Sequence, residues 1–365
     1  MKSAVRESTR SADIPATMLA VVFTAQDRFA VREVPTPHPG PREVLVRVRA
    51  SMVCASDAKI LAGKFPATKF PHVPGHEFSG EIVAVGDGVG RGPAERIGAR
   101  VGVEVHVGCG RCDRCREGMY TLCINYGRTD TGHAHIGFTI PGGLAEYVAV
   151  PVAALHLLPD EVSFLEGAWT DNLGIALWAL ERGRLVGGET VVVFGPGAIG
   201  LCAAQIALAL GAASVFVVGR GERLDRVRAL GLPIGVWDVP MADRLGKGMA
   251  DLVVEFAGTA EAARQAILTA RRGGRVVLGG STGVGTELSG VDLSTIVRGN
   301  LDLLGSLANP KGVSERALRF LMRGVDVERL VTHHFPLDQF DTAWQTFTER
   351  RDGAIRVMLH PQAES

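Results

Sequence analysis

Four cysteines fall in one short run of the sequence, at a spacing typical of metal ligands. The run reads Cys109-x2-Cys112-x2-Cys115-x7-Cys123 in a chain of 365 residues. Thiolates at such spacing close around one tetrahedral zinc ion, and four protein ligands leave no position for a substrate. Two disulfides would need an oxidising compartment, and a ferredoxin-type cluster has a shorter last interval followed by proline. We therefore predict a structural zinc site in residues 109–123.

A second and different set of metal-binding residue types lies earlier in the chain. Cys54 precedes Ser56 and Asp57, and His76 precedes Glu77. A catalytic zinc ion usually has three protein ligands and keeps one position open for water or substrate. Cys54 and His76 supply two ligands, and a carboxylate such as Asp57 would orient the imidazole through its other nitrogen. The alternative is that His76 is only a buried histidine near a turn.

A glycine-rich loop follows an apolar, strand-like segment and opens a helical pattern. The loop consists of Gly195, Pro196, Gly197, Ala198, Ile199 and Gly200. This strand–turn–helix setting is the one that a dinucleotide-binding G-x-G-x-x-G motif requires. Its three glycines would permit a tight turn, a close approach of backbone to pyrophosphate, and close helix–strand packing, in that order. The N–H groups at the start of the helix would then bind the phosphates, so we predict a cofactor site over residues 195–200.

The end of the next strand-like segment bears on the choice of nicotinamide cofactor. An acid about 20 residues beyond the first glycine normally binds the ribose 2′-hydroxyl of NAD. Here Gly219 stands at that place and Arg220 follows it. A guanidinium without a carboxylate favours the 2′-phosphate of NADP, because arginine binds phosphate through paired donors. Glu222 keeps NAD open as the alternative, since a small shift of the loop would bring this residue to the ribose.

Composition excludes several classes of partner. Lys plus Arg and Asp plus Glu are equal at 39 each, so no net field attracts the chain to nucleic acid or to an anionic membrane. The polar N-terminus lacks the apolar core of a secretory signal, and no segment approaches the ~20 apolar residues that span a bilayer. We expect a cytoplasmic protein with reduced cysteines, in which Cys202 packs as a small hydrophobe.

The pattern of apolar residues changes once along the chain. Residues 1–17 are polar and are expected to form a disordered tail. From residue 18 to about 165, short alternating segments broken by glycine and proline indicate a β-barrel domain. Apolar strands then alternate with helical segments, which indicates a doubly wound parallel sheet. A last strand-like segment, 354–359, would return to the first domain.

Together these motifs resemble the zinc-containing medium-chain alcohol dehydrogenases, from about Met18 to the C-terminus. The Cys54 loop, Gly75-His76-Glu77-x-x-Gly80, the four cysteines and the glycine loop occur in the family's order. The resemblance implies an α/β protein, with a GroES-like β-barrel catalytic domain split around a doubly wound Rossmann domain and a catalytic zinc in the cleft. The implied parts are residues 18–172 (catalytic, with the zinc lobe), 173–310 (Rossmann) and 311–365 (return).

The resemblance also assigns roles at the catalytic metal. The family's third zinc ligand comes from a segment shortly before the Rossmann half, where Asp171 fits, as in the threonine, polyol and secondary-alcohol branches. Glu166 is the alternative. Glu77 resembles the glutamate beside the metal that is thought to enter its coordination sphere transiently. Ser56 resembles the residue that passes the substrate hydroxyl proton towards the ribose or solvent.

The branch within the family is less sharply defined. Residues 102–110, with Glu104 and His106, look like the threonine and butanediol branch, but Lys59 stands where that branch often has a histidine. This departure argues against threonine itself as the substrate. His133 and His135 could line the cleft, although we expect a solvated loop for both.

The expected activity is reversible hydride transfer between NADP, or NAD, and a secondary alcohol, polyol or amino alcohol. Two zinc ions per chain are expected, one catalytic and one structural. The alternatives are a zinc-free quinone or enoyl reductase of the same superfamily and a non-catalytic nucleotide-binding protein. The relatives are dimers or tetramers, and residues 302–307 are the candidate edge strand for a homo-oligomer.

Overall fold

The structure is a computed structural model that describes residues 14–90, 92 and 95–362. Most of the tail expected at residues 1–17 therefore lies outside the described residues. Within its described end, Ile14 packs against an apolar cluster of the first unit and Thr17 opens the first strand.

The chain divides into two compact units. The first contains the residues up to Asp171, His333–Glu349 and the residues from Arg356, and the second contains Asn172–Thr332 and Arg350–Ile355. Residues 311–332, which we expected to return to the first domain, thus lie in the second unit. Their bonds explain this, because the Gln205 side chain donates to the Asp326 carbonyl at 3.1 Å and accepts from its N–H at 2.9 Å.

The first unit consists mainly of strands. Its elements are β1 (Thr17–Ala25), β2 (Arg28–Pro35), β3 (Glu43–Met52), α1 (Ala55–Leu61), β4 (Phe78–Val85), β5 (Arg100–Val103), β6 (His106–Val107), α2 (Asp113–Arg116), β7 (Ala134–His135), β8 (Tyr147–Pro151), β9 (Leu155–Leu157), α3 (Phe164–Gly167), β16 (Val331–Pro336), α11 (Phe340–Glu349) and β17 (Arg356–His360). Strand β16 crosses the boundary between the units, which lies between Thr332 and His333. Short 3-10 turns join several of them.

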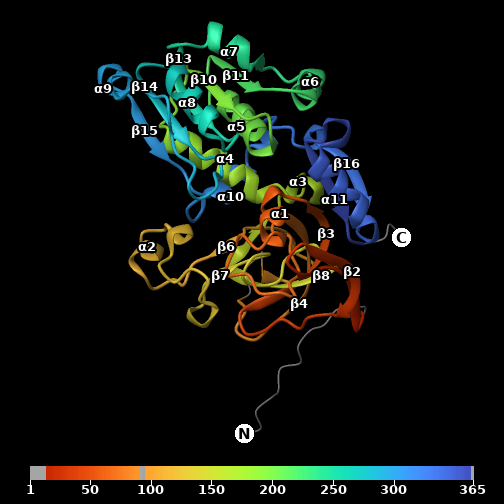
Figure 1. Ribbon diagram of the computed structural model, residues 1–365. Helices are drawn as coiled ribbons and strands as arrows, with labels where there is room; N and C mark the ends of the chain where they lie inside the picture. Colours follow the sequence, from red (N-terminus) through yellow and green to blue (C-terminus); the bar gives the residue numbers. More distant parts are fainter. Residues whose placement is uncertain (1–13, 91, 93–94, 363–365) are drawn as a thin grey trace. The chain divides into compact units, whose positions relative to one another are not determined.

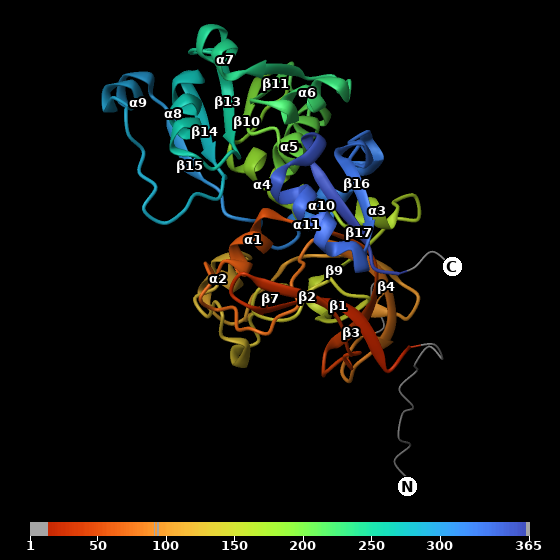
Figure 2. The ribbon, with the colours of Figure 1, turned by 45° about the vertical axis from the view of Figure 1, so that its right-hand side comes forward.

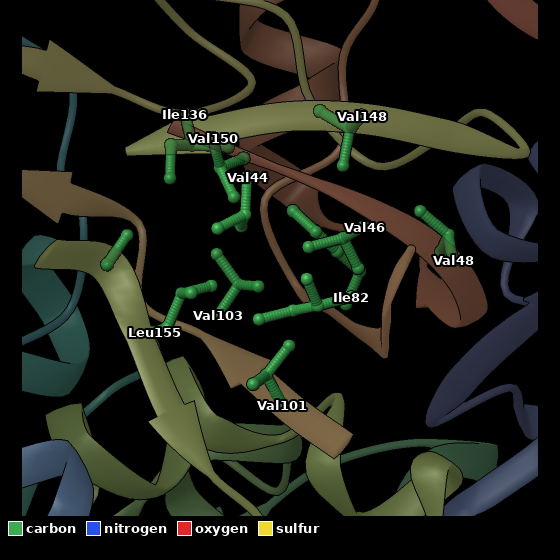
Figure 3. Close-up of a cluster of buried hydrophobic side chains, with 12 residues drawn as sticks. Val44, Val46, Val48, Ile82, Val101, Val103, Ile136, Val148, Val150 and Leu155 are labelled. Atoms are coloured by element: carbon green, nitrogen blue, oxygen red, sulfur yellow. The ribbon is translucent and has the colours of Figure 1, made fainter. Parts of the chain in front are cut away.

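A seven-stranded sheet forms the body of this unit. Its order is β16-β17-β3-β4-β5-β9, and β8 pairs with β3. Alternate residues of β3 (Val44, Val46 and Val48) point to one side, as the period of two in a strand requires, and are fully buried. Figure 3 shows them in a cluster with apolar side chains of β4, β5, β8 and β9. The last strand β17 pairs with β3 in this sheet. Of the segment 354–359 that we expected to return to the first domain, Ala354 and Ile355 belong to the second unit and the strand begins at Arg356.

The second unit alternates strands with helices. Its elements are α4 (Thr170–Arg182, which begins at the end of the first unit), β10 (Thr190–Phe194), α5 (Ala198–Ala209), β11 (Ser214–Gly219), α6 (Glu222–Ala229), β12 (Gly235–Asp238), α7 (Val239–Leu245), β13 (Ala250–Glu255), α8 (Ala260–Thr269), β14 (Ala270–Leu278), α9 (Leu293–Gly299), β15 (Asp302–Gly305) and α10 (Val313–Leu318). Figure 1 shows the sheet with α5 and α8 beside it.

The sheet of this unit is parallel and six-stranded, in the order β12-β11-β10-β13-β14-β15. Its central strand β10 is a run of β-branched and aromatic residues, as expected for a strand that neighbours bury on both faces. The fold class predicted from the sequence is therefore confirmed. Cys202 is fully buried in α5, as predicted.

Strand β15 forms one edge of this sheet, where residues 302–307 were expected to lie. Figure 2 shows α9 and the long connection before it near this edge. No helix in the described part of the chain combines the length and the apolarity needed to cross a membrane.

Candidate metal centres and dinucleotide site

Cys54 and His76 are positioned by one buried carboxylate. Cys54 immediately precedes α1, and its N–H donates to Asp57 Oδ2 at 2.8 Å, as in a helix-capping arrangement. The other oxygen, Asp57 Oδ1, lies 3.5 Å from His76 Nδ1, and the Asp57 side chain is fully buried. Neither of these two atoms has a hydrogen-bond partner among the described residues, and His76 Nε2 lies 3.9 Å from Glu77 Oε1. That Asp57 orients the imidazole for a metal stays a prediction.

The backbone before His76 requires glycine. Gly75 has φ +100°, and a Cβ added there would lie 2.4 Å from the Leu144 backbone nitrogen. Any side chain at residue 75 would therefore displace the chain at Leu144 or move His76. The close approach of these two segments explains why the histidine follows a glycine.

The structure brings Cys54, His76 and Glu77 together. One ligand atom from each lies within 4.8 Å of the others. Glu77 is buried, and its Oε1 accepts a bond of 2.6 Å from Arg356 Nη2. Arg356 also donates to the Val53 carbonyl at 3.0 Å and lies 5.5 Å from the ring centroid of Trp169. The sequence did not single out Arg356, because it lies far along the chain in a segment marked only as a strand.

Asp171 is not part of that three-residue group among the described residues. It is nevertheless buried, and its Oδ1 has no hydrogen-bond partner in the described part of the chain. Burial raises the pKa of Asp171 to about 7. Glu166, the alternative ligand, instead caps α3: its carboxylate accepts from the Ser163 N–H at 2.7 Å and its N–H donates to Ser163 Oγ at 3.1 Å.

The charges around His76 suit a cation. Burial acts to lower the pKa of His76, but nearby Cys54 and Asp57 raise it well above its ordinary value. Glu77 adds an acidic group that Arg356 pairs with at 2.6 Å, and Asp171 adds a second one nearby, whose pKa burial raises to about 7. A thiol, an imidazole and carboxylates around one point are ligands that zinc accepts. The residues present therefore fit a zinc ion.

His133 and His135 are buried, so the expectation of a solvated loop was wrong. His135 stacks on His106 and on Phe138, with centroids 3.9 and 3.7 Å apart, and its Nδ1 lies 2.6 Å from the Tyr126 hydroxyl. Phe138 in turn packs 4.9 Å from the His76 ring. These rings form an aromatic wall beside the candidate catalytic metal centre.

The four cysteines of the lobe converge as predicted. Cys109 Sγ lies 4.0 Å from Cys115 Sγ, and Cys112 Sγ lies 3.9 Å from Cys123 Sγ. These separations are too long for disulfides and close to the roughly 3.8 Å expected between thiolates on one tetrahedral zinc with 2.3 Å bonds. Asn125 Nδ2 donates to Cys109 Sγ at 3.3 Å. Figure 1 shows α2 of this lobe.

The ionisation of the lobe cysteines also fits a bound cation. Backbone N–H groups lower the pKa of Cys112, and those of Arg111 and Cys112 lower that of Cys109 to about 5. Burial raises the pKa of Cys115 and Cys123. These two thiols therefore need a nearby cation to ionise at neutral pH, because zinc binds the thiolate form.

The glycine loop lies between β10 and α5. Gly195 has φ +112°, and a Cβ at Gly200 would lie 2.1 Å from the Gly195 carbonyl oxygen. The loop borders a pocket of about 290 Å³ in the second unit, which Gly219 and Arg220 also line. A Cβ at Gly219 would lie 2.4 Å from Pro196 Cγ. A ribose-binding acid at residue 219 would thus require the loop to shift.

A β-barrel unit with a Cys/His metal centre and a cysteine zinc lobe, joined to a dinucleotide-binding parallel sheet, defines a zinc-dependent dehydrogenase class. Residues 40–160 match the alcohol dehydrogenase GroES-like domain, and residues 198–323 match the zinc-binding dehydrogenase domain. The chain belongs to the zinc-binding alcohol dehydrogenase family, which confirms the resemblance inferred from its motifs and makes it an oxidoreductase.

Curated relatives match over nearly the whole chain. A sorbitol dehydrogenase from Halalkalibacterium halodurans is 32% identical over 91% of this chain and 96% of its own. An L-threonine 3-dehydrogenase from Rhizobium etli is also 32% identical, over 89% of this chain and 93% of its own.

Solved structures agree with this assignment. A zinc-binding dehydrogenase from Sinorhizobium meliloti 1021, bound to NADP, has a TM-score of 0.84 at 29% identity and covers 95% of this chain and 100% of its own. An E. coli structure described as a short chain alcohol dehydrogenase, in complex with NADH, has a TM-score of 0.82 at 27% identity, with the same coverage. Similar folds thus carry either nicotinamide cofactor.

Proposed function

We propose that this protein is an NADP-dependent zinc dehydrogenase that oxidises a secondary alcohol, polyol or amino alcohol, or reduces the corresponding carbonyl compound. The observation that carries the proposal is the group of Cys54, His76 and Glu77 within 4.8 Å, in a chain that also holds a glycine-loop pocket. The named activities of the sorbitol and threonine dehydrogenases support this substrate range.

Cys54, His76 and Asp171 are the proposed ligands of the catalytic zinc, and Cys109, Cys112, Cys115 and Cys123 those of the structural zinc. Asp171 is proposed because it is buried and its Oδ1 lacks a hydrogen-bond partner among the described residues. Glu77 is the alternative third ligand because of its place in the three-residue group. When bound at this centre, zinc supplies Lewis-acid polarisation of an alcohol or carbonyl oxygen.

The chain's own residues then hold the substrate and move its proton. Ser56 is half-buried in the first turn of α1, two residues after Cys54, and is proposed to pass the hydroxyl proton onward. Asp57 keeps the His76 ring in its orientation. The rings of His106, His135 and Phe138 form one wall of the site and restrict the access of water. Hydride exchange is the chemistry that a bound nicotinamide supplies.

NADP is the proposed cofactor, bound at Gly195, Gly197, Ala198, Ile199, Gly200, Gly219 and Arg220. Gly219 leaves the ribose without a carboxylate, and Arg220 lines the same pocket. Paired guanidinium donors match a phosphate group better than a hydroxyl.

A homo-oligomer, either a dimer or a tetramer, is proposed to form along the edge strand β15. Leu293, Val297 and Leu307 are exposed next to this edge, and apolar exposure beside an open sheet edge favours pairing with a second copy. A cytoplasmic location is proposed because thiols held as zinc ligands persist in a reducing compartment.

The activity is tested by nicotinamide absorbance with NADP and NAD separately, over a range of pH, against polyols, amino alcohols and secondary alcohols. We expect turnover with at least one alcohol, none in Cys54→Ala, and unchanged NADP binding in that variant. Cys202→Ala is the matched control, because Cys202 is buried in α5 of the second unit and belongs to neither group of candidate metal ligands. A chain that holds one metal ion and turns over no alcohol would favour the zinc-free reductase or the non-catalytic alternative.

A further inference from the structure

Arg350 lines the dinucleotide pocket from a segment that no sequence motif marks. The pocket is bordered by the glycine loop and by Arg220 at the end of β11, and Arg350 reaches it from a distant part of the chain. Residues Arg350–Ile355 belong to the second unit, although the chain before and after them belongs to the first. The segment therefore contributes a cation to a site that is otherwise built by the parallel sheet.

The backbone of this segment is held in place by α6. Arg223 donates from Nε and Nη2 to the Ala354 carbonyl at 3.2 and 3.0 Å. At Gly353, an added Cβ would lie 3.3 Å from the Glu222 carbonyl oxygen, so the segment lies close against the helix. The Ile355 N–H donates to Thr332 Oγ1 at 3.1 Å. Arg350 thus extends from an anchored loop.

Arg350 itself has an uncommon backbone conformation. Its φ of +56° and ψ of 37° place it in the left-handed region, which side-chain-bearing residues other than asparagine and aspartate rarely adopt. Such outliers persist where the surroundings determine them, and they concentrate at ligand-binding sites. Asp352 in the same segment also has a positive φ, so the conformation describes how this loop turns and the position of Arg350 in the pocket lining carries the argument.

The charges in the pocket favour an anion. Glu261 is the one acidic residue that lines it, and both of its oxygens accept from Arg264, at 2.9 and 2.7 Å. Arg220 and Arg350 form no side-chain hydrogen bond or ion pair with the described residues. Arg220, Arg223 and Arg350 thus line the described pocket together with one carboxylate, Glu261, on which Arg220 also acts electrostatically. The lining carries an excess of positive charge, which suits a dianionic phosphate.

We propose that Arg350 is a specificity-determining residue that binds the 2′-phosphate of NADP together with Arg220. The proposal rests on the proposed use of NADP. Each guanidinium offers paired N–H donors, and a phosphate has three acceptor oxygens, so both can bind it together. Discrimination against NAD then comes from two arginines that are 130 positions apart, as the sequence numbering shows.

Binding of cofactor fragments tests the proposal without any turnover. Calorimetric titration compares 2′,5′-ADP with 5′-AMP, which differ in the 2′-phosphate, for the full chain and for Arg350→Met, Arg350→Lys and Arg220→Met. We expect Arg350→Met to weaken 2′,5′-ADP at least about tenfold and 5′-AMP less than about twofold, since a charge-assisted bond is lost. Arg350→Lys keeps the charge but loses the paired donors, so its affinity should fall in between.

The control is Arg323→Met, because Arg323 lies at another hollow of the same unit, next to Phe320. Its affinities should match those of the parent chain. A parent chain that binds both fragments equally would overturn the use of NADP and this proposal together. A parent chain that prefers 2′,5′-ADP, with the preference intact in Arg350→Met, would overturn the role of Arg350 alone. Equal weakening of both fragments would mean that Arg350 supports the fold of the pocket instead.

Discussion

Arg356 Nη2 donates to Glu77 Oε1 at 2.6 Å, although 279 positions separate the two residues. Arg356 opens the returning strand β17, and Glu77 follows the candidate metal ligand His76. Both side chains are almost fully buried, at 5% and 2% exposure. The final strand of the chain therefore supplies the cation that pairs with the buried carboxylate next to His76.

We expect Arg356→Met to destabilise the first unit strongly. The substitution leaves the Glu77 carboxylate buried without its partner, and breaking one side of a buried ion pair costs about 3–5 kcal/mol. The free energy of unfolding from urea titration measures the effect. The control is Arg316→Met, which breaks the largely exposed pair with Glu181 and should cost at most about 1 kcal/mol. Similar losses in the two variants would contradict the role given to burial.

Local patterns predicted the elements of the dinucleotide site well. The strand-like segment expected before the glycine loop and the helix expected after it appear as β10 and α5. This succeeds because an apolar run, a turn glycine and a helix start are adjacent in sequence, so their geometry is fixed by neighbours. The convergence of four cysteines within 15 residues was predictable for the same reason.

Contacts between distant segments were not predictable. Arg356 contacts Glu77, and Arg350 lines the dinucleotide pocket, although both lie far along the chain from their partners. No sequence pattern around a charged residue near a C-terminal strand predicts such a long-range contact. His133 and His135 were expected in a solvated loop, yet both are buried. His135 stacks on Phe138 and His106, and His133 packs against Tyr126. Burial of a polar residue depends on partners that only the folded chain brings together.

The zinc content of single-cysteine variants should show that the two metal centres bind zinc independently. We expect two zinc ions per chain by elemental analysis, one after Cys123→Ser and one after Cys54→Ala. Cys123→Ser should also lower the thermal stability, because a structural zinc site contributes directly to folding free energy. Cys54→Ala should leave the lobe's metal in place. Loss of both ions from either variant would show that the centres are not independent.

Two glycines of the cofactor loop should respond to alanine in different ways. A Cβ at Gly197 meets no atom within 4 Å, whereas one at Gly200 lies 2.1 Å from a backbone oxygen. Gly197→Ala should change the free energy of unfolding by less than about 0.5 kcal/mol but weaken dinucleotide binding, because the methyl group occupies the approach to the pyrophosphate. Gly200→Ala should lose about 1–3 kcal/mol of stability. Denaturation and cofactor titration of both variants check this, and equal stability would refute the packing argument.

The buried His135 should make the protein less stable in mild acid. Burial and its neighbouring histidines hold the pKa of His135 well below its ordinary 6.5. Between the lowered pKa of the folded chain and 6.5, the unfolded chain binds a proton at His135 that the folded chain does not. The free energy of unfolding is therefore undiminished above pH 6.5 and falls as the pH drops below it. One such group removes about 1 kcal/mol between pH 6.5 and 5.5. His135→Phe keeps a ring for stacking and should show a shallower decline over this range, and an identical slope would contradict the prediction.

The last prediction concerns the carboxylate that completes the catalytic metal centre. Asp171 is buried, and its Oδ1 has no hydrogen-bond partner among the described residues. Removing a ligand should weaken zinc binding at this centre by more than about tenfold, so Asp171→Asn should hold one zinc ion. Glu77→Gln should keep two ions while losing turnover. Glu166→Gln should keep both, since Glu166 caps α3. Competition with a chelator measures each affinity, and loss of the second ion from Glu77→Gln but not from Asp171→Asn would make Glu77 the third ligand.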